Sequence, residues 1–216
     1  MKLSKTISGQ VIRFLDAPDR NHEHTAVQLA RRLEERYGFL QGPNAVRDYD
    51  RANGITFLKG IFRTEVIEKL QIFDVGILCE MSAPTEIADA FLDDLTSWAN
   101  DNFNLGISKL SHPPSGYVST LEFSSDFRLD TMMKPVSEIG IILSKFLNAR
   151  GHDLPPYSGW GVRMNLDPGL KNLKPGEFAL EHRANKPFAE RIYYSTAPLT
   201  TKEHLALLEK VEALAN

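Results

Sequence analysis

The sequence predicts an α+β fold in which a mainly antiparallel sheet carries about four helices. Short runs with apolar residues at every second position indicate strands, as at Trp160, Val162 and Met164. Runs with apolar residues three or four apart indicate helices, as at Ile87 and Phe91. Because short turns join many of the successive strands, we expect antiparallel pairing with the helices gathered on one face.

The first half of the chain is predicted to follow the order βαββα. Strands are expected at residues 9–15, 55–62 and 70–81, and helices at residues 25–37 and 84–100. Thr25 and Gln28 match a capping box, and Gly38 is typical of a helix stop. Residues 63–69 fit either a helical turn or an extension of a neighbouring strand, and both alternatives remain open.

The second half is predicted to follow the order βαβββα. Strands are expected at residues 117–124, 160–166, 178–183 and 191–195, and helices at residues 130–148 and from residue 200 onward. Pro135 is tolerated near the start of the first helix or kinks it. Thr200 and Glu203 match a second capping box. The helix at 130–148 carries an apolar stripe that is expected to shelter the sheet: Val136, Ile139, Leu143, Phe146 and Leu147. The last helix is expected to bury Leu205, Leu208, Val211 and Leu214.

Two features indicate an internal duplication. The corners Ser82-Ala83-Pro84 and Thr196-Ala197-Pro198 both join a strand to a helix, a little over a hundred residues apart, and the opening strands are similarly offset. Chance is the alternative, because Ala-Pro before a helix is common. A duplication would divide one domain, residues 1–216, into pseudo-symmetric halves, 1–108 and 109–216, with a groove between them as a natural ligand site.

The composition is that of an ordinary globular chain. Of its 216 residues, 42% are hydrophobic and 25% are charged, far from the signature of disorder. The single cysteine, Cys79, cannot form an intrachain disulfide, and no zinc-site spacing is present. The N-terminal region lacks the apolar stretch of a secretory signal, and the densest apolar run, residues 139–143, is far shorter than the ~20 residues of a membrane span. We therefore expect a reduced, cytoplasmic protein without a membrane partner.

The charge distribution argues against nucleic-acid binding. The formal net charge is −3, whereas nucleic-acid binders usually carry a basic face. Arg31, Arg32 and Arg36 are interleaved with Glu34 and Glu35. A nucleic-acid partner is therefore not expected.

The densest polar cluster lies between the first strand and the first helix. Residues two apart in an extended segment face the same way, so His22 and His24 could share a metal ion with Asp16 or Asp19. The alternative is that short polar residues before a helix satisfy its free N–H groups. No third spaced ligand, GxSxG motif or phosphate-binding loop is present.

Three single features are assigned to structure. His182 is in phase with the apolar residues of its strand and is expected to lie in the core. Cys79 is expected to act as a small hydrophobic residue. The acidic residues Asp89, Asp93 and Asp94 are expected to form a solvated helix face.

Four aromatic residues of the second half could form a binding surface: Tyr157, Trp160, Tyr193 and Tyr194. Tyrosine and tryptophan supply rigid contact area at interfaces and ligand pockets, although core packing explains these four equally well. Several strands also carry apolar residues on both faces, for example Ile55 and Phe57 against Leu58 and Phe62. A one-sided layer of helices would leave one face bare, so a second layer or a partner is expected.

The sequence therefore predicts a non-catalytic protein that acts as an interaction module or as a subunit of a larger homo- or hetero-assembly. Two alternatives remain open. One is a metal-dependent or acid/base enzyme that uses residues 16–24, and the other is a small-molecule-binding protein with a groove between the halves. No cofactor is assigned.

Overall fold

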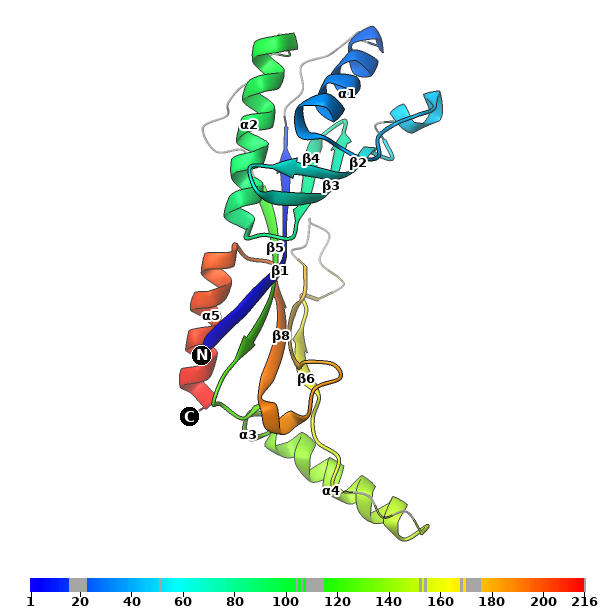
Figure 1. Ribbon diagram of the computed structural model, residues 1–216. Helices are drawn as coiled ribbons and strands as arrows, with labels where there is room; N and C mark the ends of the chain where they lie inside the picture. Colours follow the sequence, from blue (N-terminus) through cyan, green and yellow to red (C-terminus); the bar gives the residue numbers. More distant parts are fainter. Residues whose placement is uncertain are drawn as a thin grey trace. The chain divides into compact units, whose positions relative to one another are not determined.

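A computed structural model gives the fold, and most of its helices and strands are labelled in Figure 1. It describes residues 1–15, 23–50, 52–103, 105, 107, 115–151, 153, 155–167, 169 and 176–215. The chain falls into two compact units. The N-terminal unit comprises Thr6–Thr120 and Pro198–Lys202, and the C-terminal unit comprises Met1–Lys5, Leu121–Ala197 and Glu203–Asn216.

The predicted α+β class is confirmed. The strands are β1 (Lys2–Phe14), β2 (Ile55–Phe62), β3 (Glu65–Phe73), β4 (Gly76–Met81), β5 (Ser115–Ser124), β6 (Gly161–Met164), β7 (Phe178–His182) and β8 (Ile192–Ala197). Within the described residues they form one eight-stranded sheet in the order β2-β3-β4-β1-β5-β8-β7-β6. The registers of β1 with β4, β2 with β3, β3 with β4, β6 with β7 and β7 with β8 are all antiparallel.

Four long helices accompany this sheet in the described part of the chain. They are α1 (Glu23–Tyr37), α2 (Thr85–Phe103), α4 (Lys134–Asn148) and α5 (Thr201–Ala215). A single helical turn, α3 (Leu129–Met132), and two 3-10 turns, η1 (Val46–Tyr49) and η2 (Phe188–Glu190), complete the elements.

The strand predicted at residues 70–81 is in fact two strands. Phe73 pairs with Gly76, so Asp74 and Val75 form a tight turn between β3 and β4. Val75 is 64% exposed instead of lying in a buried row. The prediction failed because apolar alternation runs through this turn and no proline or glycine stands inside it. For residues 63–69, the structure shows a strand extension and not a helical turn, because β3 begins at Glu65.

With the additional strand, both halves share the order βαβββα when α3 and α4 are counted as one interrupted helix. Within the sheet, the first half runs β2-β3-β4-β1 and the second half runs β6-β7-β8-β5 from the outer edge inward. This agreement supports an internal duplication, which itself stays a prediction. The two compact units do not coincide with 1–108 and 109–216, because each includes a short segment from the opposite end of the chain.

Three helix details differ from the prediction. The helix α1 begins at Glu23, two residues before the predicted cap position Thr25. The stretch at 130–148 is interrupted at Met133, and Pro135 lies in the first turn of α4, where its missing N–H is not needed. Leu214 is 83% exposed at the end of α5, so this helix buries a shorter stripe than expected.

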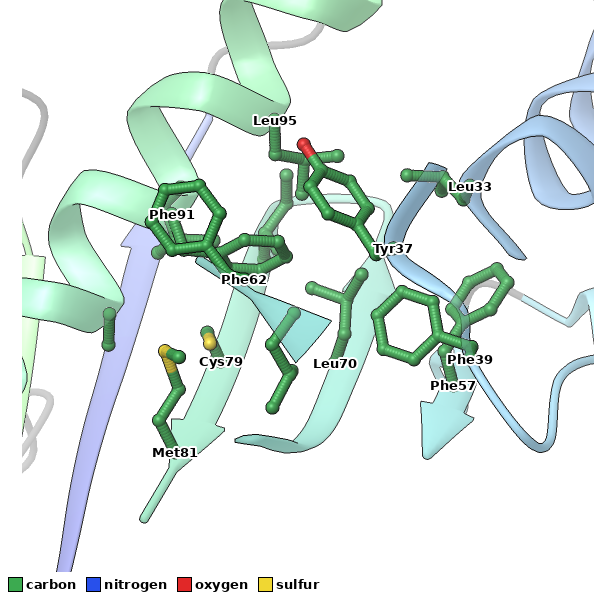
Figure 2. Close-up of a cluster of buried hydrophobic side chains, with 14 of the residues drawn as sticks. Leu33, Tyr37, Phe39, Phe57, Phe62, Leu70, Cys79, Met81, Phe91 and Leu95 are labelled. Carbon is green, nitrogen blue, oxygen red and sulfur yellow. The ribbon is translucent and has the colours of Figure 1, made fainter. Parts of the chain in front are cut away.

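The core of the N-terminal unit lies between the strands and the two helices α1 and α2. In Figure 2, Phe91 and Leu95 of α2 and Tyr37 of α1 lie over the side chains of Leu70 and Cys79. The rings of Tyr37 and Phe91 are 5.0 Å apart in an edge-to-face contact. Cys79 is fully buried and burial raises the pKa of its thiol, which confirms its expected role as a small hydrophobic residue.

The strand β2 is not apolar on both faces in the way that its sequence indicates. Lys59 adopts a left-handed backbone conformation with φ of 58°, which shifts the side-chain alternation. Phe62 therefore joins the same buried cluster as Phe57, and Ile61 is 58% exposed. Of the residues predicted to need a second layer over this strand, only Leu58 remains outside the buried cluster, and it is half-buried.

Asp94 of α2 binds two side chains of α1. Tyr37 donates its hydroxyl to Asp94 Oδ2 at 2.7 Å, and Arg36 Nη2 donates to the same oxygen at 2.9 Å. Burial acts to raise the pKa of Asp94, but the hydrogen bonds from Tyr37 and Arg36 outweigh it and hold that pKa below its ordinary value. The prediction that Asp94 is merely solvated is wrong.

Thr85 and Thr201, the first residues of α2 and α5, cap each other. The backbone N–H of Thr201 donates to Thr85 Oγ1 at 2.8 Å, and the backbone N–H of Thr85 donates to Thr201 Oγ1 at 3.0 Å. Both threonines are buried, so these two N–H groups depend on one another. The pair follows the two corners that indicated a duplication, Ser82-Ala83-Pro84 and Thr196-Ala197-Pro198.

We expect Thr85→Ala to lower the free energy of unfolding by about 1–2 kcal/mol, because it removes the acceptor of a buried N–H group. Thr85→Ser keeps the hydroxyl and is expected to retain most of that stability. Urea unfolding of both variants tests this, and equal losses from serine and alanine would show that the methyl group matters and the hydroxyl does not.

The lowered pKa of Asp94 predicts an acid-dependent loss of stability. A carboxylate with a lowered pKa stabilises the fold fully above its ordinary value of ~4, and this contribution disappears as the pH falls through the folded-state pKa. Asp94→Asn is therefore expected to be less stable than wild type by about 1 kcal/mol at neutral pH and to show a shallower decline below about pH 4. Unfolding curves over that pH range measure this, with the exposed Asp101→Asn on the same helix as the control. Parallel pH dependence in wild type and Asp94→Asn would contradict the prediction.

Candidate functional site

The four predicted binding aromatics all lie in the C-terminal unit, but they do not form one surface. Tyr157 and Trp160 are 47% and 46% exposed. Tyr193 is buried and donates its hydroxyl to the backbone oxygen of Phe127 at 2.9 Å. Tyr194 is half-buried on the opposite face of β8, because successive strand residues alternate sides. Tyr157 and Trp160 are therefore the most exposed of the four, and a binding role for this set stays a prediction.

A row of rings connects Trp160 to the core of its unit. The ring of Trp160 lies 5.7 Å from that of Phe188, Phe188 stacks on His182 at 4.1 Å, and His182 lies 5.0 Å from Tyr193. His182 is buried in β7, as its phase in the sequence predicted. The row anchors Trp160 while leaving part of its ring exposed.

The predicted metal ligands cannot be assembled from the described part of the chain. Asp16 and His22 lie outside the described residues, and so does the side chain of His24, although its backbone belongs to α1. Among the side chains that are described, no group of three His, Cys, Asp or Glu could hold a metal ion. The metal site stays a prediction.

Ser195 and His204 form a serine–histidine pair that the sequence did not reveal. Their Oγ and Nε2 atoms are 2.9 Å apart. The Ser195 hydroxyl donates to the backbone oxygen of Ala179 at 2.7 Å, so His204 Nε2 carries the proton and donates to Ser195. Both side chains are fully buried, and a nucleophile would have to be reached by substrate and deprotonated by its base. This hydrogen bond therefore links β8 to α5. Because His204 donates it, the histidine does not accept the Ser195 proton as a catalytic base would.

Arg13 of β1 is a buried cation whose charge is already neutralised. Its Nη1 donates to Asp93 Oδ1 at 2.7 Å and its Nη2 donates to Asp89 Oδ1 at 2.9 Å. Arg13 is 8% exposed. Two carboxylates around one guanidinium leave no positive charge for an anionic ligand, and they show that these two acidic residues of α2 are paired and not simply solvated.

The helix α4 of the C-terminal unit turns its apolar side outward. The exposed fractions are 42% at Val136, 64% at Ile139, 53% at Ile142, 43% at Leu143 and 65% at Phe146. These residues follow one another at intervals of three and four, so they form one stripe along the helix. We call these five residues the α4 face. The expectation that Val136, Ile139, Leu143 and Phe146 shelter the sheet is wrong. Leu147, the fifth residue of the predicted stripe, is half-buried, and Ile142 was not part of that prediction.

A narrow strip of α4, formed by the buried residues Gly140 and Ser144, packs against residues 155–160, while the adjacent Ile141 is 44% exposed. The backbone N–H of Tyr157 donates to Ser144 Oγ at 3.0 Å. The same hydroxyl lies 3.0 Å from the backbone oxygen of Gly140 and 3.2 Å from that of Pro155. A methyl group on Gly140 would lie 2.0 Å from the backbone oxygen of Tyr157. Glycine at this position permits the close approach that directs this strip of α4 inward.

Within the described part of the chain, all five side chains of the α4 face stay at least 42% exposed. At one border of the stripe, a methyl group on Gly159 would lie 3.6 Å from Val136 Cγ1, so the stripe reaches the residue next to Trp160. Within the described chain no helix combines the length and the apolarity needed to cross a bilayer.

Sequence periodicity found four of the five residues of the α4 face, all but Ile142, but it did not show that they point outward. A helical stripe shows which residues share a side of a helix, and the usual inference is that this side is buried. The spacing of Gly140 and Ser144 argues against burial of the stripe. These two small residues are four positions apart on another side of the helix, and such a pair suits close packing against another backbone.

Removing the hydroxyl that holds residues 155–160 against α4 should loosen that segment. Ser144→Ala leaves the Tyr157 N–H without its acceptor, so we expect its amide hydrogen to exchange at least about tenfold faster, which corresponds to about 1.4 kcal/mol. Hydrogen–deuterium exchange measures this. Ser137→Ala, on the same helix but without a hydrogen bond to this segment in the described chain, is the control. Unchanged exchange at Tyr157 in Ser144→Ala would contradict the assignment.

No family model matches this chain, and no curated protein or solved structure matches it either. Its function therefore has to be argued from the burial, contacts and charges of its own residues.

Proposed function

We propose that this chain is a non-catalytic protein-interaction module and that the α4 face is its docking surface. The observation that supports this proposal is the outward orientation of five large apolar side chains on a helix whose narrow strip of small residues is already packed. Scattered exposed apolar residues are normal on protein surfaces, but a contiguous apolar stripe is a feature of binding sites.

The size of the stripe supports a protein partner. Taking about 150–250 Å² for a large side chain, the exposed fractions correspond to roughly 500 Å² of apolar surface. That area is comparable to the largest apolar patch of a typical monomer, which is often functional. It is also a convex helix surface and not a concave pocket, and convex apolar helices usually dock into another protein.

Tyr157 and Trp160 support the same proposal as neighbours of the α4 face. Both are about half exposed, and both belong to the segment that packs along α4. Aromatic residues at the border of an apolar patch add contact area while their rings lose little conformational entropy. We assign them to the rim of the docking surface, whereas Tyr193 serves the core.

We also propose that the chain and its protein partner are cytoplasmic, and the charge and cysteine content are compatible with this location. The chain is slightly acidic, with a formal net charge of −3, and its one cysteine is a buried free thiol. The alternative of an enzyme that uses residues 16–24 stays a prediction, as does a ligand groove between the halves.

A photo-crosslinking residue placed at Ile142 tests the docking surface. We expect it to give a discrete covalent product with a protein partner in cells that produce the chain, because a docked partner would lie against this side chain. Leu214, which is 83% exposed on α5, is the control position and should give no such product. Phe146→Ser should abolish the product at Ile142 while changing the free energy of unfolding by less than about 0.5 kcal/mol, since Phe146 is largely exposed.

Equal products from both probe positions, or none from Ile142, would contradict the proposed docking surface. A product that survives Phe146→Ser would place the contact outside the α4 face.

A further inference from the structure

We infer that the occupant of the α4 face is a second copy of this chain, bound by antiparallel pairing of the two α4 helices about a two-fold axis. This inference rests on the proposed function, because it names the partner of the same surface. Three properties of α4 carry it: the area of its apolar stripe, the match of the stripe to itself when reversed, and the order of the charges along one edge.

The available area meets the requirement of a specific dimer. Each copy offers roughly 500 Å² of apolar side-chain surface on the α4 face, so two copies bury about 1,000 Å² of apolar area before any polar atoms are counted. Specific interfaces begin at about that total. A two-fold dimer also uses the same patch on both copies, so no second apolar surface is required.

The stripe is complementary to itself when two copies run in opposite directions. The two-fold axis crosses α4 at the level between residues 140 and 141, on the side of the stripe. Ile139 then lies against the partner's Ile142, and Ile142 lies against the partner's Ile139. One turn further out, Phe146 meets the partner's Pro135, and both of these residues are exposed. Each large side chain on one helix thus meets an apolar side chain on the other, as knobs-into-holes packing requires.

The two edges of the stripe match in the same register. Along one edge, Val136 lies beside the partner's Leu143, which closes the apolar contact. Along the other edge, Glu138 and Lys145 are seven residues apart and therefore share one side of the helix. Antiparallel pairing sets Glu138 beside the partner's Lys145 and Lys145 beside the partner's Glu138, which gives two symmetric ion pairs.

Glu138 and Lys145 are available for those contacts. Both are exposed, and neither has an ion-pair partner within the described part of its own chain. A parallel pair would instead set this charged edge beside the apolar edge formed by Val136 and Leu143, because unlike edges meet in parallel coiled coils. The charge order therefore selects the antiparallel arrangement.

Charge reversal in the full-length chain tests this geometry. Sedimentation equilibrium over a concentration series should show wild type passing from one chain of 24.3 kDa to two as concentration rises. Glu138→Lys and Lys145→Glu each turn two attractions into two repulsions, and each should raise the dimer dissociation constant about tenfold. The double variant Glu138→Lys/Lys145→Glu restores opposite charges across the axis and should return the constant to within about twofold of wild type.

The matched controls are Glu209→Lys and Lys210→Glu, which make the same charge changes at exposed positions of α5. They should leave the dissociation constant unchanged. Ile142→Ser should keep the chain monomeric, with an unaltered far-ultraviolet circular dichroism spectrum as proof of folding.

Three results would overturn the inference. They are a wild-type monomer at every attainable concentration, a dimer that is indifferent to Glu138→Lys, and a double variant as weak as the single ones. A monomer that binds vesicles of phosphatidylcholine and phosphatidylserine through Ile142 would assign the α4 face to a lipid surface instead. If the chain is monomeric but the probe at Ile142 captures a different protein, the second copy is excluded and the docking surface stands. If that probe captures nothing, both proposals fail.

Discussion

The close approach of Gly140 to the backbone of Tyr157 is the constraint on which the surface chemistry of this protein depends. A helix can bury any of its sides, and α4 has a large apolar side and a narrow strip of small residues. The hydrogen bonds of Ser144 and the missing side chain of Gly140 give this strip a partner within the chain. The large apolar side is left outward as a consequence, although burial of that side would otherwise be favoured.

Local patterns in the sequence carried most of the fold. Alternating residues located β6 and β7, β-branched and aromatic content located β2, and helical spacing located α1, α2 and α5, because these signals arise from neighbours along the chain. They failed where one pattern ran across a boundary. Phe73, Val75 and Ile77 alternate as one strand, yet the chain turns at Val75. Lys59 shows the converse, because its left-handed backbone breaks the alternation inside a single strand.

Local sequence patterns could not predict contacts between residues that are far apart in the chain. The pairing of Arg13 with Asp89, the pair of Ser195 and His204, and the mutual capping of two threonines each need the tertiary fold to bring the partners together. The same limit applies to the candidate surface. Periodicity identified four members of the α4 face and missed Ile142, but only the contacts of Gly140 show that this side of the helix is not the one that packs.

The mutual capping of Thr85 and Thr201 has a consequence for the order of folding. These residues are 116 positions apart, and residues 198–202 belong to the N-terminal compact unit. During synthesis, the start of α2 has no buried cap until Thr201, which is 116 positions further along the chain, has left the ribosome. The N-terminal unit cannot reach its final state as an early, independent product of translation, and this long-range closure is expected to slow its completion.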